Sequence, residues 1–246
     1  HGHLDHHGLA NAVKERSNAK LYVHKLDGKI VSHFDEEIKR YLEFFEATCI
    51  RSGVPEKLLG KISGYLKSMV KTCESAEVDF LIEDKQTIRL RDFELRVIHT
   101  PGHSPGSICL YLEAQGILFS GDTLLGDITP NPSIDPGGGG LLSYLQSIER
   151  LQQMDIRMAF PGHHGVIENH REVIKKIFEH HEIRKNSVLQ VISLQPRTVF
   201  EISKSLFGDL PVSEVLLGVR EIAGHLEILE SENKVELQTV NGIDYY

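Results

Sequence analysis

The sequence predicts a mixed fold of the α/β (or α+β) class, followed by a smaller domain. Short β-rich segments bounded by Asp, Pro and Gly alternate with helical segments as far as about residue 170. A second pattern begins near Ser187, where short helical segments precede a hairpin signal. The 246 residues are enough for one large domain and one small one.

Hydrophobic periodicity assigns the elements of the larger domain. Apolar residues at helical spacing predict helices at 8–16, 35–47, 55–71, 141–154 and after Glu168. Compact β-prone runs predict strands at 20–24, 87–90, 94–98, 107–112, 116–120 and 156–160. We expect the two helices between 35 and 71 to form a hairpin inserted between strands. The segment 131–140 contains two prolines and four consecutive glycines, which predicts a loop.

The C-terminal segment predicts a domain with the element order of a winged helix. Helical patterns at 188–193, 199–206 and 212–229 are followed by two β-prone runs joined by Asn241-Gly242. Asn-Gly between such runs is a strong hairpin signal. The expected organisation is a domain over 1–170 with a helical insertion at about 35–75, then a linker helix and winged-helix-like domain over 171–246.

Composition and charge restrict the location and the partners. The net charge of −8 argues against a protein that mainly grips phosphate backbones, although a local basic face leaves nucleic acid as a secondary alternative. No apolar run is long enough to span a bilayer, so no membrane partner is expected. Cys49, Cys73 and Cys109 form neither a disulfide framework nor a metal knuckle, which is typical of a reducing cytoplasm.

The first eight residues hold a dense group of potential metal ligands. His1, His3, Asp5 and His6 lie within six residues, on a turn that leads into a helix. Imidazole nitrogen and carboxylate oxygen suit zinc, iron or manganese.

Three more candidate ligands follow predicted strands. His103 lies in the turn Thr100-Pro101-Gly102-His103-Ser104-Pro105-Gly106, Asp122 in Ser120-Gly121-Asp122-Thr123, and His163 in Pro161-Gly162-His163-His164-Gly165. Loops at the ends of strands commonly build active sites on a rigid sheet. The order of these turns after the opening cluster predicts a single site.

This series resembles the metal-ligand series of the metallo-β-lactamase superfamily, and more narrowly its glyoxalase II-like hydrolases with a C-terminal winged helix. The resemblance covers roughly residues 1–170 as the catalytic domain. It implies an αββα sandwich, lacking its opening strands in this chain, with the site at one edge of the sheets. It implies that His1, His3 and His103 hold one metal, that Asp5, His6 and His163 hold a second, and that Asp122 bridges them.

The chemistry implied is hydrolysis by a hydroxide that bridges two divalent ions, zinc being favoured over iron or manganese. Two such ions lower the pKa of a shared water and polarise the oxygen under attack. Asp5 and Asp122 would orient the nucleophile as they ligate, so these two are the expected catalytic residues. The favoured substrate is a small thioester or ester, in the manner of glyoxalase II.

Two other functions remain open from the sequence. A metal-dependent nuclease or phosphodiesterase acting on RNA is one, because the tail is winged-helix-like and basic residues such as Arg171 and Lys175 precede it. A mononuclear iron oxygenase of the same fold is the other, since ligand residues alone do not fix the metal. The tail is expected to pack on the catalytic domain or to form a homodimer.

The remaining histidines are expected to be surface or core residues. His7 and His164 adjoin candidate ligands and are expected to lie behind the ligands or at the surface, and His99, just before the Thr-Pro turn, is expected to be a strand-end residue. No ligand-like spacing is found for His24, His33, His170, His180, His181 and His225.

Overall fold

The computed structural model describes residues 1–134, 137 and 139–246, which form two compact units. The first unit contains residues 1–34 and 73–180, and the second contains residues 35–72 and 181–246. The predicted helical insertion therefore forms one unit with the C-terminal helices. Within the described residues, no helix is both long and apolar enough to cross a lipid bilayer.

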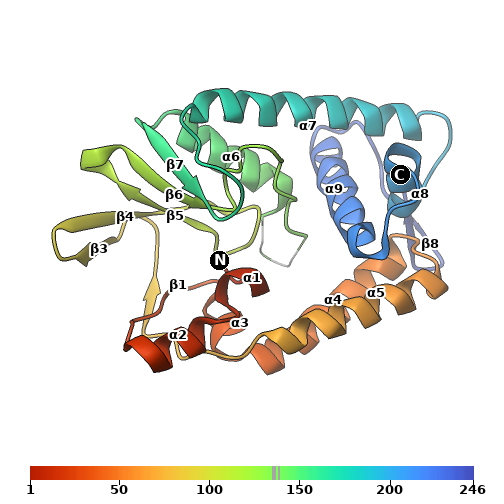
Figure 1. The fold of residues 1–246 in the computed structure, drawn as a ribbon. Coiled ribbons are helices and arrows are strands. Elements are labelled where there is room, and N and C mark those ends of the chain that lie inside the picture. The colour runs from red at the N-terminus through yellow and green to blue at the C-terminus, as the bar shows by residue number, and fades with distance from the viewer. Residues whose placement is uncertain (135–136, 138) are drawn as a thin grey trace. The chain divides into compact units, whose positions relative to one another are not determined.

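A five-stranded sheet is the framework of the first unit (Figure 1). Its order is β3-β4-β5-β6-β7, antiparallel except for the parallel pair β6–β7. The strands are β3 (Thr87–Leu90), β4 (Phe93–His99), β5 (Ile108–Leu112), β6 (Ile117–Gly121) and β7 (Met158–Pro161). Each overlaps a strand that the sequence predicts. Burial alternates along β5, where Cys109 and Tyr111 are buried, because successive side chains of a strand point to opposite faces.

A separate two-stranded parallel sheet joins β1 (Tyr22–His24) to β2 (Phe80–Ile82). Ile82 belongs to one buried cluster with Ile88, Leu95 and Val97 of the large sheet. The sequence predicted β1 but not β2. The short helices α1 (Leu4–His7), α2 (Ala10–Ser17) and α3 (Gly28–Ser32) complete this part of the first unit.

Helix α6 (Gly140–Gln152) packs on the loops at the ends of β4 and β6. The Tyr144 hydroxyl donates to the Thr123 carbonyl at 3.1 Å, and the Ser147 hydroxyl donates to the Pro101 carbonyl at 2.8 Å. Gly102 has φ +127°, and a Cβ there would lie 2.3 Å from the Tyr144 backbone. Only glycine fits this close approach. The helix thus fixes the turn that carries His103.

The loop predicted at 131–140 is described only in part. Residues 135, 136 and 138 lie outside the described residues, so the prediction for them, including the middle of the four-glycine run, is not tested. Residues 131–134 have no regular secondary structure, and α6 begins at Gly140.

The second unit is mainly helical. Its elements are α4 (Phe34–Arg51) from Asp35 onward, α5 (Glu56–Met69), η1 (Val70–Thr72), α7 (His170–Ile192) from His181 onward, α8 (Val199–Phe207), α9 (Val212–Ser231), β8 (Gln238–Val240) and β9 (Ile243–Tyr245). A separate helix at 188–193 was predicted wrongly, because α7 continues unbroken to Ile192. The remaining short element in the first unit is η2 (Glu113–Gln115).

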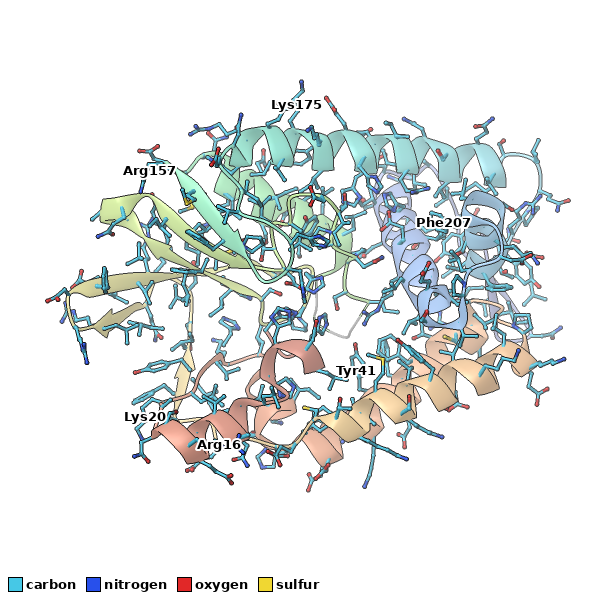
Figure 2. The ribbon with its side chains drawn as sticks, in the orientation of Figure 1. Arg16, Lys20, Tyr41, Arg157, Lys175 and Phe207 are labelled. Atoms are coloured by element: carbon cyan, nitrogen blue, oxygen red, sulfur yellow. The ribbon has the colours of Figure 1, made fainter. Side chains whose placement is uncertain are left out.

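Local sequence signals explain several features of the second unit. Thr198 and Glu201 form a reciprocal capping box at the start of α8. Asn241 and Gly242 have φ of 52° and 81°, as the predicted hairpin turn requires. A tertiary contact joins α7 to α8, because the guanidinium carbon of Arg184 lies 4.5 Å from the ring centre of Phe207. Phe207 is labelled in Figure 2. The helix–helix–hairpin order agrees with the sequence, and the winged-helix-like assignment stays a prediction.

Gly60→Ala and Gly64→Ala should each stabilise the protein. Both glycines lie within α5, and a Cβ at either meets no heavy atom within 4 Å. Alanine lowers the conformational entropy of the unfolded chain without a clash, which is worth about 0.5–1 kcal/mol per site. Urea unfolding of the single variants would measure the gain. A loss of stability in both variants would contradict this account of α5.

Candidate metal centre

The seven predicted ligand residues lie together in the first unit. They form three overlapping groups in which all potential ligand atoms lie within 4.8 Å of one another. The groups are His1, His3 and His103; His1, His6 and Asp122; and Asp5, His6 and His163. The structure therefore brings together residues that are far apart in the chain.

The first group is the more enclosed. His3 Nδ1 lies 2.9 Å from His1 Nε2 and 3.1 Å from His103 Nε2. The His1 side chain is only 2% exposed, and that of His103 is 13% exposed. His103 Nδ1 lies 3.0 Å from the Asn131 carbonyl oxygen. Because a carbonyl only accepts, Nδ1 donates this hydrogen bond, which leaves Nε2 facing the other two imidazoles.

The group of Asp5, His6 and His163 opens to the surface. His163 Nε2 lies 3.1 Å from Asp5 Oδ2 and 3.2 Å from His6 Nε2. The side chains of Asp5 and His163 are 59% and 43% exposed. A molecule in solution can therefore approach the site from the side of these two residues.

Asp122 lies between the group of His1, His3 and His103 and the group of Asp5, His6 and His163. Its Oδ2 atom is 3.3 Å from His6 Nε2, 3.5 Å from His163 Nε2 and 3.6 Å from His103 Nε2. Its Oδ1 atom is buried and has no hydrogen-bond partner among the described residues. Burial alone would raise the pKa of Asp122, but the hydrogen bond and charge of His6, with the charges of His103 and His163, hold that pKa below its usual value. The carboxylate thus stays ionised at neutral pH.

The absence of a side chain at Gly162 makes room for the carboxylate of Asp122. A Cβ at Gly162 would lie 2.6 Å from Asp122 Oδ1 and 2.8 Å from His6 Cε1. A contact below 3.0 Å would force one of these groups to move. The glycine before His163 is therefore part of the site, a role that the sequence did not reveal.

The histidines beside the ligands lie at the margins of this group. His7 is 5% exposed, packs edge-on against Phe34 and lies 3.6 Å from Cys73 Sγ. His164 has φ +66° and an exposed ring whose Nδ1 lies 3.9 Å from Asp127 Oδ2. Neither belongs to the three ligand groups.

Asp27 is a residue near the site that sequence reasoning missed. It is buried, and it accepts a hydrogen bond from the Gly2 backbone N–H at 2.7 Å. Nothing in its spacing from the candidate ligands marks it, because the contact depends on how two distant segments fold together.

His24, outside the ligand groups, should make stability depend on pH. The residue is 4% exposed, and its ring stacks on that of His99 at 4.0 Å between ring centres. Burial, with the nearby charge of His99, lowers the pKa of His24 to about 4. Unfolded, the residue titrates near pH 6.5, so the folded state binds fewer protons between these values. The stabilisation, up to about 3 kcal/mol, is present above pH 6.5 and is lost as the pH falls toward 4.

The measurement is urea unfolding of metal-free protein at pH 7 and pH 4.5. His24→Phe keeps an aromatic ring for the stack but cannot take up a proton, so its stability should fall less between the two pH values. An equal fall in wild type and variant would contradict the assignment to His24.

The sequence and the fold both have relatives. The family model described as "Metallo-beta-lactamase superfamily" matches residues 1–163. A probable metallo-hydrolase of Bacillus subtilis is 27% identical over 242 residues, covering 96% of this chain and 74% of that protein. An atrochrysone carboxyl ACP thioesterase of Aspergillus fumigatus is 32% identical over 142 residues, covering 53% of this chain and 43% of that protein.

Among solved structures, a metallo-beta-lactamase family protein from Thermus thermophilus has a TM-score of 0.85 at 26% identity, covering 100% of this chain and 77% of that one. A beta-lactamase domain protein from Burkholderia ambifaria shares the fold, with a TM-score of 0.82 at 24% identity, covering 100% of this chain and 72% of that one. The predicted fold class is confirmed by these likenesses. Since the family model spans most of the chain, this protein is a member of the metallo-beta-lactamase superfamily.

Proposed function

We propose that the protein is a dinuclear, metal-dependent hydrolase of small thioesters or esters. The observation that carries the proposal is the convergence of five imidazoles and two carboxylates into overlapping groups. In this proposal one ion would be held by His1, His3 and His103 and a second by Asp5, His6 and His163, and Asp122 would contribute to both.

The donor atoms fit such ions. Nitrogen ligands at the usual bond length from one tetrahedral zinc ion lie about 3.3 Å apart, close to the 2.9–3.2 Å separations found here. The buried Asp122 Oδ1 atom, which has no hydrogen-bond partner among the described residues, also suits a cation. Nitrogen and oxygen donors favour zinc, and iron or manganese would accept the same set.

When bound, a pair of divalent ions lowers the pKa of water and polarises the oxygen under attack. The residues supply the orientation. Asp122 is buried and ionised, so it can hold the attacking water from within the site. Asp5 lies at the exposed side, where its carboxylate can accept a hydrogen bond from the same water. These two carboxylates are the proposed catalytic residues.

No covalent intermediate is expected on Cys49 or Cys109. Burial raises the pKa of the Cys49 and Cys109 thiols to about 11, so both are protonated at neutral pH. A thiol in that state is a poor nucleophile. Direct attack by water on the substrate is the mechanism that the carboxylates of Asp5 and Asp122 support.

The thioester class is supported by one relative. The Aspergillus fumigatus protein is named as a thioesterase of an acyl carrier protein, and this chain spans 43% of its length. We therefore propose an acyl thioester as substrate, cleaved in the manner of glyoxalase II. A small-molecule ester or thioester is accordingly the proposed partner, while a homodimer and a cytoplasmic location stay predictions.

The test is thiol release from a short acyl thioester by metal-reconstituted protein, with a chelator-treated sample as control. Metal-dependent turnover is the expected result, and the matched oxygen ester would show whether the thiol leaving group matters. Two bound metals without turnover would contradict the thioesterase assignment and direct the assay to RNA and phosphodiester substrates.

A further inference from the structure

Asp27 connects the two backbone segments that carry the first ligand group. Its Oδ2 atom accepts a hydrogen bond from the Gly2 N–H at 2.7 Å and another from the Ser104 hydroxyl at 3.1 Å. Gly2 lies between His1 and His3, and Ser104 follows His103 directly. One oxygen atom thus holds both segments that supply the three imidazoles of that group.

The position of Asp27 in its own helix supports this role. Asp27 is the N-cap residue of α3, where an aspartate side chain usually accepts a hydrogen bond from the first turn. Here the side chain makes no capping hydrogen bond. Its hydrogen bonds go instead to Gly2 and Ser104, although the residue is only 3% exposed. Burying a carboxylate is costly unless it is hydrogen-bonded, so these contacts fix its geometry.

The surrounding loop is built around this carboxyl group. A Cβ at Gly106 would lie 2.3 Å from Asp27 Cγ and 2.5 Å from Asp27 Oδ1. The Ser104 hydroxyl also lies 2.8 Å from the Ser107 hydroxyl, which accepts a hydrogen bond from the Ser104 N–H at 3.1 Å. Asp27 therefore contacts a cross-linked turn, and the absence of a side chain at Gly106 permits the approach.

We propose that Asp27 is a positioning residue that sets the metal affinity of the group formed by His1, His3 and His103, and not of the group formed by Asp5, His6 and His163. This inference rests on the proposed dinuclear function. Its physical basis is that ligands held by outer contacts need less ordering when the ion binds, and loss of such contacts typically costs 10–100-fold in affinity.

The central test measures the two metal affinities separately, by competition between the protein and a chromophoric zinc chelator. In Asp27→Ala, one equivalent of zinc should bind about 10–100-fold more weakly, while the other keeps its affinity. Cobalt loading identifies the affected site, because the visible spectrum of Asp27→Ala with one equivalent should match that of His103→Ala and differ from that of His163→Ala.

Asp27→Asn separates hydrogen bonding from charge. Both hydrogen bonds end on the same oxygen, so an amide oxygen in that place can keep both. We expect near wild-type affinity in this variant. Ser104→Ala removes one of the two contacts and should weaken the same equivalent by a smaller factor than Asp27→Ala. If Asp27→Ala does not fold, these two variants decide the matter.

Asp79→Ala is the matched control. Asp79 is another aspartate of the first unit with several partners, accepting from the Leu21 N–H and from Lys14 and Lys20, but these contacts join no ligand segments. Lys20 is labelled in Figure 2. This variant should lose thermal stability and keep both zinc affinities.

Three results would overturn the inference: unchanged affinities in Asp27→Ala, equal weakening of both equivalents, or an Asp27→Asn variant as weak as Asp27→Ala. If the inference alone fails, wild type still binds two zinc ions. A wild type that binds fewer than two would instead contradict the dinuclear function itself.

Discussion

Asp122→Ala is expected to lose bound metal and hydrolytic activity together. The carboxylate lies within 3.9 Å of imidazoles from both outer ligand groups, so its removal takes an oxygen donor from each. It also removes the buried group proposed to hold the attacking water. We expect kcat/KM to fall on the order of 10³-fold, the range found when a group that stabilises the transition state is deleted. Elemental analysis and the thioester assay would be run on the same preparation.

Asp127→Ala is the control for this variant. Asp127 lies five residues further along the chain, and its side chain is 78% exposed. Replacing it should change neither metal content nor turnover by more than about twofold, since exposed charges contribute little. Full activity with full metal occupancy in Asp122→Ala would refute the assignment of Asp122.

Gly162→Ala should reduce activity through a single added methyl group. That group would lie 2.6 Å from Asp122 Oδ1 and 2.8 Å from His6 Cε1, so the carboxylate or the imidazole must shift. Misplacement by about 1 Å can cost on the order of 10²-fold in rate. Gly162 itself has no positive φ, so the change adds no backbone strain. Metal affinity and kcat should therefore fall more than thermal stability does.

Gly165→Ala provides the comparison within the same turn. A Cβ at Gly165 meets no heavy atom within 4 Å, and this variant should behave as wild type. If both alanine variants lost activity equally, mobility of the turn rather than contact with Asp122 would be the cause.

Much of the fold could be predicted where local signals suffice. The hairpins of the large sheet combine two-residue alternation with Gly and Asp at the turns, and β3 was predicted at its observed bounds. Strand β2 was missed because it is only three residues long, too short to show a repeating pattern. Its partner β1 lies 58 residues earlier in the chain, so the pairing depends on tertiary contacts.

The candidate site could likewise be predicted only in part from the sequence. Its seven ligand residues stand in short motifs, so the sequence could predict them and the structure brings them together. Asp27 and Gly162 could not be predicted in the same way. Asp27 acts through the hydrogen bond that it accepts from the Gly2 N–H, 25 residues earlier in the chain. Gly162 acts through the absence of a side chain next to Asp122 and His6. Neither property is visible in residue type or spacing.

The span of the ligand residues along the chain has a thermodynamic consequence. His6 and His163 are 157 positions apart, yet their Nε2 atoms lie 3.2 Å from each other. An unfolded chain would seldom hold them so close, so the ions should bind the native state far more tightly than the denatured state. Mass action then couples occupancy to folding, and free metal at a hundred times the dissociation constant adds about 2.7 kcal/mol for each site. Resistance to denaturation should therefore vary with the metal supply of the medium.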